Sequence, residues 1–71
     1  MHRISARAFQ AKADLEMCTK SIAYLKNRQA TLQKTGCTRT AQAVGAEIEY
    51  FELRAESAKG MLEAEVGQAS E

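Results

Sequence analysis

The stretch Thr35-Gly36-Cys37-Thr38 is the clearest interruption in this sequence. Gly36 can adopt the left-handed backbone conformation that ends a helix, and Thr38 or Thr40 can cap the helix that follows. Elsewhere the 71-residue chain has 13 alanines and no proline, a composition that favours helix on both sides of the interruption. We therefore expect one all-α domain with a first helix at about 4–35, a turn at 36–38, a second helix at about 39–66 and a frayed tail at 67–71.

Apolar residues on both sides of the turn form a heptad seam, because their spacing alternates between three and four residues. The seam of the first helix consists of Ile4, Ala8, Ala11, Leu15, Cys18, Ile22, Leu25, Gln29 and Leu32. The seam of the second helix consists of Ala41, Val44, Ile48, Phe51, Ala55, Ala58 and Leu62. When the chain folds at the turn, residues whose numbers add up to 73 face each other, so that Leu25 meets Ile48. This register predicts an antiparallel, coiled-coil-like helical hairpin.

Charge is divided between the two halves of the chain. Residues 1–35 carry seven Lys or Arg and two acids, a balance of +5, whereas residues 36–71 carry three and seven, a balance of −4, for a total of +1. We expect Arg28 to pair with Glu47, and Lys26 with Glu52, beside the seam. Exposed pairs of this kind contribute only about 0–1 kcal/mol each, so they orient the helices more than they stabilise them.

Large apolar residues also occur outside the seam. Phe9, Met17 and Tyr24 follow one another at intervals of eight and seven residues, which predicts a stripe on one side of the first helix. Burying a side chain of this size is worth about 1.5–3 kcal/mol, and an isolated hairpin can hide few of them. We therefore expect two hairpins to form a homodimeric four-helix bundle, the alternative being a different protein that receives the stripe. The predicted dimer or partner interface comprises Phe9, Met17, Tyr24, Tyr50, Leu53 and Met61.

Two positions leave alternatives open. Gln29 is polar on an apolar seam, where it either fixes the register of the helices or is simply hydrated near the turn. Gly45 lies inside the second helical segment, where glycine costs about 1 kcal/mol relative to alanine. It either permits a close approach of the helices or is merely tolerated.

Residues that carry chemistry are nearly absent. The only histidine, His2, lies at a terminus, and one histidine with two cysteines 19 positions apart does not make a zinc site. No phosphate-binding loop, zinc-protease motif or nucleophile elbow occurs, so we expect no enzyme activity, catalytic residue, cofactor or metal. Cys18 lies on the seam and Cys37 in the turn, too far apart for a disulfide within the chain. Two unpaired thiols indicate a reducing, cytoplasmic location, and a redox role of Cys37 is a minor alternative.

The excess apolar surface and the lack of a catalytic constellation indicate a small protein-interaction module: an adaptor, an inhibitor or a chaperone-like regulatory subunit acting through helix packing. In size and architecture the predicted hairpin is similar to helical co-chaperones of secretion systems and to small phage-encoded inhibitors. This similarity concerns shape and covers no sequence motif, so it implies a helical interaction surface and no particular partner. No apolar run approaches the length of about 20 residues that spans a bilayer, and we expect no membrane association.

The alternative function is RNA or DNA binding by a homodimeric four-helix bundle through the basic first helix. In layout, though not in sequence, the hairpin resembles plasmid copy-control proteins that bind paired RNA loops as four-helix dimers. The acidic second helix would cancel much of the field of the basic helix. The candidate nucleic-acid contacts are Arg7, Lys12, Lys20, Lys26 and Arg28.

Overall fold

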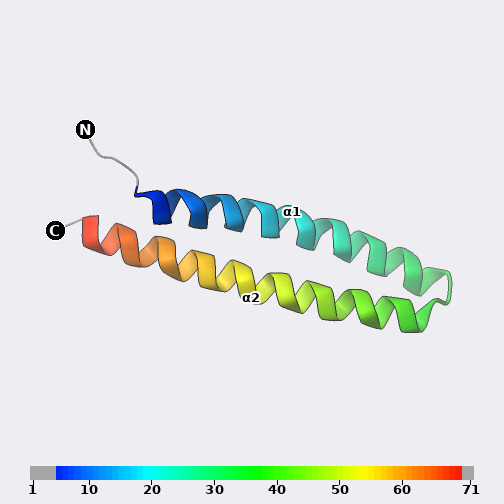
Figure 1. The fold of residues 1–71 in the computed structure, drawn as a ribbon. Coiled ribbons are helices and arrows are strands. Elements are labelled where there is room, and N and C mark those ends of the chain that lie inside the picture. The colour runs from blue at the N-terminus through cyan, green and yellow to red at the C-terminus, as the bar shows by residue number, and fades with distance from the viewer. Residues whose placement is uncertain (1–4, 70–71) are drawn as a thin grey trace.

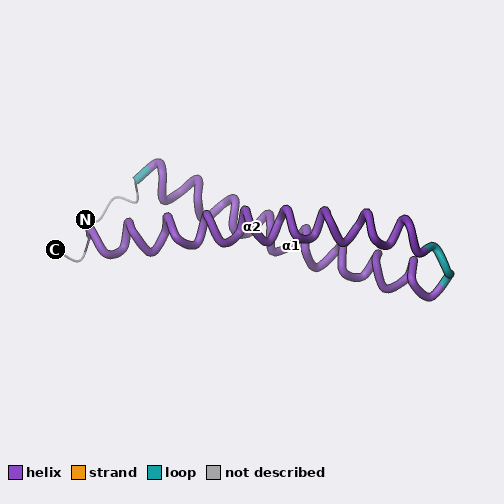
Figure 2. Tube along the Cα trace, turned by 90° about the horizontal axis from the view of Figure 1, so that it is seen from below, coloured by secondary structure: helices purple, strands orange, loops and turns teal. Residues whose placement is uncertain are grey.

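The protein is an antiparallel hairpin of two long helices, described here from a computed structural model that covers residues 5–69. Helix α1 spans Ala6–Lys34 and helix α2 spans Thr38–Ala69. The two lie side by side along their whole length and join at one end (Figure 1), in a rod of 54 × 16 × 14 Å. Seen from below they cross near the middle of the rod (Figure 2), as expected of helices that wrap around each other to keep a heptad seam in contact. The predicted helical hairpin is confirmed.

The first end of α1 is fixed by Ser5, a cap that the sequence analysis did not identify. Ser5 has an extended backbone, with φ −62° and ψ 155°, and its Oγ accepts a hydrogen bond from the backbone N–H of Ala8 at 3.0 Å. This bond satisfies one of the backbone donors that the first turn of a helix leaves free. The helix therefore begins at Ala6, whereas the expected start at residue 4 lies outside the described residues.

The turn has the geometry predicted from Gly36. Its φ of +80° is the left-handed conformation that glycine adopts without steric cost. The N–H of Gly36 donates to the carbonyl of Gln33 at 3.2 Å, and the N–H of Cys37 donates to that of Leu32 at 2.9 Å. Together these bonds form a Schellman motif, which satisfies carbonyls at the end of α1.

The start of α2 differs from the expectation. Thr38 and Thr40 both lie inside the helix, so neither occupies the capping position. That position belongs to Cys37, whose carbonyl accepts the first helical hydrogen bond, from the N–H of Ala41 at 2.9 Å. The reason is the tightness of the turn, since only Cys37 separates the left-handed Gly36 from the first helical residue.

The far end of α2 also corrects the prediction. The helix continues through Ala69, so residues 67–69 of the expected frayed tail are helical, and residues 70–71 lie outside the described residues. Glycine costs a helix only about 1 kcal/mol. Gly67 therefore does not end α2.

The seam forms the core, as predicted. Within residues 5–65, the eight buried apolar residues are all seam positions, namely Ala8, Ala11, Cys18, Leu25, Ala41, Val44, Ile48 and Ala58. The other described seam residues are half-buried, and Ile4 lies outside the described range. Leu25, Val44 and Ile48 form a central cluster, against which Ile22, Leu32 and Phe51 pack. This cluster contains the predicted contact region of Leu25 with Ile48.

Gln29 links the helices near the turn. Its side-chain Nε2 donates to the carbonyl of Ala41 at 3.1 Å, across the seam. A Cβ added at Gly45 would lie 3.0 Å from the same Nε2. Gly45 therefore leaves the space that the Gln29 amide occupies, which favours the close-approach alternative over simple tolerance.

The ion pairing differs from the expectation. The structure contains an ion pair between Arg54 and Asp14, at 3.8 Å, and within residues 5–69 neither of the two predicted pairs forms. The predicted pairs were Arg28 with Glu47 and Lys26 with Glu52. All four of these side chains are exposed. An exposed pair gains too little energy to hold two long side chains in one geometry.

Candidate interaction surface

Over residues 5–65, six large apolar side chains are exposed, with exposed fractions from 40% to 72%. They are Phe9, Met17, Tyr24, Tyr50, Leu53 and Met61, the residues predicted to form an interface. Their exposure follows from the geometry of the fold, because a two-helix hairpin has a single seam and every other side of each helix faces solvent. Whether they form one surface depends on the side of the seam on which each lies.

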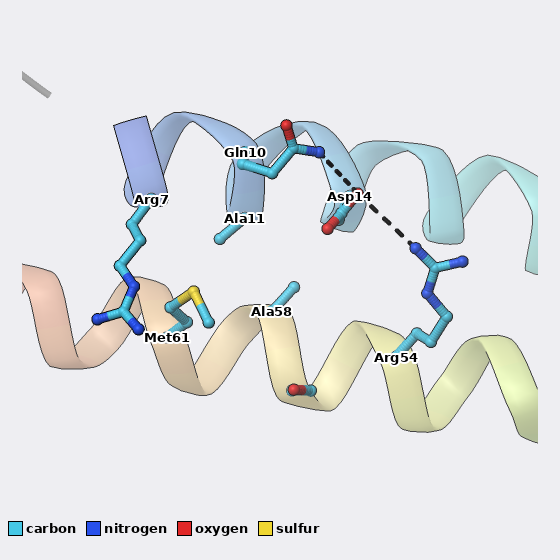
Figure 3. A pocket seen from close by; sticks show the side chains of 8 residues that line it. Arg7, Gln10, Ala11, Asp14, Arg54, Ala58 and Met61 are labelled. Atoms are coloured by element: carbon cyan, nitrogen blue, oxygen red, sulfur yellow. Dashed lines mark hydrogen bonds and ion pairs between the residues drawn. The ribbon is translucent and has the colours of Figure 1, made fainter. Parts of the chain in front are cut away.

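A shallow groove of about 330 Å³ lies across the open half of the hairpin, away from the turn. Figure 3 shows its walls, with Arg7 and Gln10 on α1 and Arg54 and Met61 on α2. The side chain of Gln10 donates to Asp14 at 3.2 Å, and Asp14 pairs with Arg54. Three small residues complete the lining of this groove, namely Ala11, Ser57 and Ala58, of which the two alanines are buried.

A second groove of about 290 Å³ lies closer to the turn. It is lined by Lys20, Ser21, Tyr24, Leu25, Glu47 and Phe51. Tyr24 forms one wall with its exposed ring, while Leu25 and Phe51 belong to the seam. Both grooves are open and shallow, so each fits a side chain of another protein better than an enclosed small molecule.

Both grooves lie on the same side of the seam. In α1, positions 7, 14, 21 and 28 each directly precede a seam residue, and in α2 positions 47, 54 and 61 do the same. The ion pair between Asp14 and Arg54 shows that these two rows meet on one side of the hairpin. Side chains three residues further along each helix neighbour these rows. Met17, Tyr24 and Tyr50 stand at such positions, and Met61 stands in the row itself.

We call this side the tyrosine–methionine face, defined by Met17, Tyr24, Tyr50 and Met61 together with the two grooves. At its centre Arg54 lies over the ring of Tyr50, with its guanidinium carbon 5.8 Å from the ring centroid. The same ring packs edge-on against Phe51, with 5.3 Å between the centroids. Tyr50 is therefore held in place while more than half of its surface remains exposed.

Phe9 and Leu53 do not lie on this face, so the predicted stripe of Phe9, Met17 and Tyr24 on the first helix is corrected at Phe9. An interval of eight residues rotates a side chain by about 80° around the helix axis, whereas seven residues rotate it by only about 20°. Phe9 directly follows seam residue Ala8 and is three residues from Lys12, so it lies on the other side of the seam. Leu53 occupies the back of α2, opposite the seam.

The other side of the seam carries mostly charge, and we call it the charged face. Its rows consist of residues that directly follow seam positions, with their neighbours. The charged members are Lys12, Glu16, Lys26, Glu49, Glu52, Glu56, Lys59 and Glu63. All of these side chains are exposed. Phe9 is the one large apolar side chain in these rows over residues 5–65.

The five candidate nucleic-acid contacts are exposed but do not gather into one patch. Arg7 and Arg28 lie on the tyrosine–methionine face, whereas Lys12 and Lys26 lie on the charged face. Lys20 stands at the back of α1. Strong phosphate binding uses several cations on one surface. The structure does not bring these residues together.

The cysteines lie where the sequence analysis expected them. Cys18 is buried in the seam and Cys37 is exposed in the turn, and both are free thiols. Over residues 5–69, no group of three or more His, Cys, Asp or Glu side chains is arranged to hold a metal ion. Neither helix, within the described range, has an apolar stretch long enough to cross a membrane.

Sequence reasoning identified the exposed residues but missed the grooves. The small residues Ser21, Ser57 and Ala58 line these grooves, together with the larger Arg54. The available signal was the occurrence of small residues beside the seam at positions where the other face carries Lys or Glu. Comparison with protein-family models, curated proteins and solved structures found no match to this chain.

Proposed function

We propose that this chain is a protein-interaction module that acts through helix packing on its tyrosine–methionine face. The observation that carries the proposal is the gathering of four of the six large exposed apolar side chains, with both grooves, on one side of the seam. Tyrosine and methionine are enriched in protein interfaces, where their flexible or amphipathic side chains fit irregular surfaces. The partner covers this face with helices, either as a second hairpin in a four-helix bundle or as part of another protein.

The energetics support a partner. Fully burying a side chain of this size is worth about 1.5–3 kcal/mol, so four of them provide a substantial part of a binding energy. The hairpin itself is built on a thin core, because five of the eight buried residues are alanine or cysteine. Small domains with thin cores gain stability from association. We place the module in the cytoplasm, because its two thiols are unpaired.

Site-specific photo-crosslinking tests this proposal without knowledge of the partner. A photoreactive benzoyl-phenylalanine replaces Tyr50 in one variant and Phe9 in the matched control, both in the cells that naturally make the chain. Phe9 is more exposed than Tyr50, at 68% against 56%, so exposure alone would favour the control. We expect protein adducts from position 50 and few or none from position 9.

Three outcomes would contradict the proposal. Equal adducts from both positions would show that the two faces do not differ. Absence of any protein adduct from position 50 would show that this face is not an interface. Adducts with RNA or DNA from either position would favour the nucleic-acid function instead.

A further inference from the structure

We infer that the occupant of the tyrosine–methionine face is a second copy of this chain, docked face to face with both turns at the same end. This inference rests on the proposed function, since it uses the same face, and it adds the identity and orientation of the partner. In this arrangement a two-fold axis runs along the rod, and α1 of each copy packs on α2 of the other. Four antiparallel helix neighbours result, as in a four-helix bundle.

The order of charges along the face favours this arrangement. Moving away from the turn, α1 presents Arg28, Asp14 and Arg7, which are positive, negative and positive. Moving the same way, the row of α2 on this face presents Glu47, Arg54 and Met61, which are negative, positive and apolar. With a helical rise of about 1.5 Å per residue, Arg28 lies about 13 Å from the turn and Glu47 about 16 Å. The cation of Arg28 therefore meets the carboxylate of Glu47 when α1 of one copy covers α2 of the other.

A dimer with its two turns at opposite ends would bring like charges together. If the turns pointed in opposite directions, α1 would cover α1 and α2 would cover α2. With the exposed faces overlapping fully, Arg28 would then lie against Arg7 of the second copy, and Glu47 would face no cation. Like charges placed across an interface weaken the wrong arrangement. The charge balance of the two halves, +5 and −4, acts in the same direction.

Side chains of one copy also lie level with the grooves of the other copy. Met17 lies about 29 Å from the turn, and Ser57, which lines the outer groove, lies about 31 Å from it. Tyr50 lies about 20 Å from the turn, between the levels of Leu25 and Ser21 in the inner groove, at about 17 and 23 Å. Each copy therefore presents a methionine and a tyrosine at the levels where the other copy has its two grooves.

Charge reversal in single and mixed variants tests the contacts. We expect Arg28→Glu and Glu47→Arg each to weaken self-association by at least about tenfold, because each places like charges together twice per dimer. When the two variants are mixed, the reversed charges become complementary between chains. Native mass spectrometry should then show heterodimer well above the half expected from random mixing. The matched controls are Lys26→Glu and Glu49→Arg, which make the same charge changes on the charged face and should leave self-association within about twofold.

Cys37 supplies a test of orientation in the wild-type sequence, because it is exposed in the turn while Cys18 is buried. A nitroxide spin label on Cys37 reports the distance between the two turns by pulsed electron resonance. We expect a distance of about 20 Å, which is the width of two helices of diameter 10–12 Å. A distance near the rod length of 54 Å would overturn the orientation. The Cys37→Ser variant, treated in the same way, controls for labelling at Cys18.

Failure of this inference is distinguishable from failure of the proposed function. If the purified chain shows no dipolar signal and stays monomeric, a second copy is excluded as the occupant. Crosslinks from position 50 to a different protein would then leave the proposed function intact. If the chain dimerises but the mixed variants show no preference for the heterodimer, the charge pairing proposed here is wrong.

Discussion

The two faces of this hairpin differ although the same two helices and the same seam produce them. The tyrosine–methionine face carries four large apolar side chains and two grooves, whereas the charged face carries eight Lys or Glu side chains and, over residues 5–65, Phe9 as its one large apolar residue. A seam of small and aliphatic residues holds the helices together and serves both faces equally. The difference teaches that the fold depends on the seam, while the binding properties depend on the residues immediately before and after it.

A substitution in the seam should unfold the hairpin and so remove both faces together. Leu25→Ala truncates a buried residue of the central cluster and should destabilise the hairpin by about 2–5 kcal/mol, as large-to-small substitutions in cores do. Because the seam is the only core in the described residues, we expect the loss of most helical structure. Circular dichroism during urea unfolding measures the change. A loss below about 0.5 kcal/mol would contradict the central role of this cluster, because such small changes are typical of surface positions.

A substitution on one face should separate binding from folding. Tyr50→Glu places a charge at the centre of the tyrosine–methionine face and should weaken association at least about a hundredfold, since buried tyrosines are frequent hot spots of interfaces. Phe9→Glu makes a comparable change on the charged face and should leave association within about twofold. Sedimentation equilibrium measures both dissociation constants. Equal effects of the two substitutions would remove the distinction between the faces.

Two glycine substitutions in α2 should differ in their effect on stability. At Gly60 an added Cβ meets nothing within 4 Å, so Gly60→Ala should stabilise the helix by up to about 1 kcal/mol. At Gly45 the added Cβ would crowd the Gln29 amide and disturb its bond to the Ala41 carbonyl. The stability gained from Gly45→Ala should therefore be smaller than that gained from Gly60→Ala. The difference should be about 0.5–1.5 kcal/mol, which is the net contribution of a hydrogen bond. Thermal unfolding of the two variants checks the order, and an equal gain would contradict the structural role of Gly45.

The smallest expected effect concerns the ion pair of the tyrosine–methionine face. Asp14→Asn removes the charge that faces Arg54 but keeps the shape of the side chain. Since both partners are partly exposed, the stability of the hairpin should fall by at most about 1 kcal/mol, and the loss should shrink at high salt. Urea unfolding at two salt concentrations measures this difference. A larger loss of stability that does not depend on salt would contradict a screened electrostatic contribution of this pair.

Much of the fold was predictable because its determinants are local in the sequence. The heptad spacing identified every residue that is buried within positions 5–65, and Gly36 identified the turn, because each reports the backbone geometry of its own position. The six exposed apolar residues were also identified, because positions outside a single seam face solvent. The cap at Ser5 and the continuation of α2 to Ala69 were missed. Helix ends depend on individual hydrogen bonds of the backbone, which periodicity does not report.

The division into faces was less accessible to sequence reasoning. Phe9 was placed in line with Met17 because intervals of seven and eight residues look similar in a sequence. On a helix they differ by about 100° of rotation, enough to move Phe9 across the seam. The Asp14–Arg54 pair was missed for a related reason, since it requires knowing which flanks of the two helices meet. Antiparallel packing determines which flanks meet, because it brings the row of Asp14 in α1 and the row of Arg54 in α2 to the same side of the hairpin.

Light scattering over a concentration series, at low and high salt, measures the solution mass of the chain and so tests whether a second copy covers the tyrosine–methionine face. We expect a species of twice the 7.8 kDa chain mass for the wild type and for Phe9→Glu, and a species of single mass for Tyr50→Glu. A wild-type mass of 7.8 kDa at every concentration would contradict the burial of the tyrosine–methionine face by a second copy.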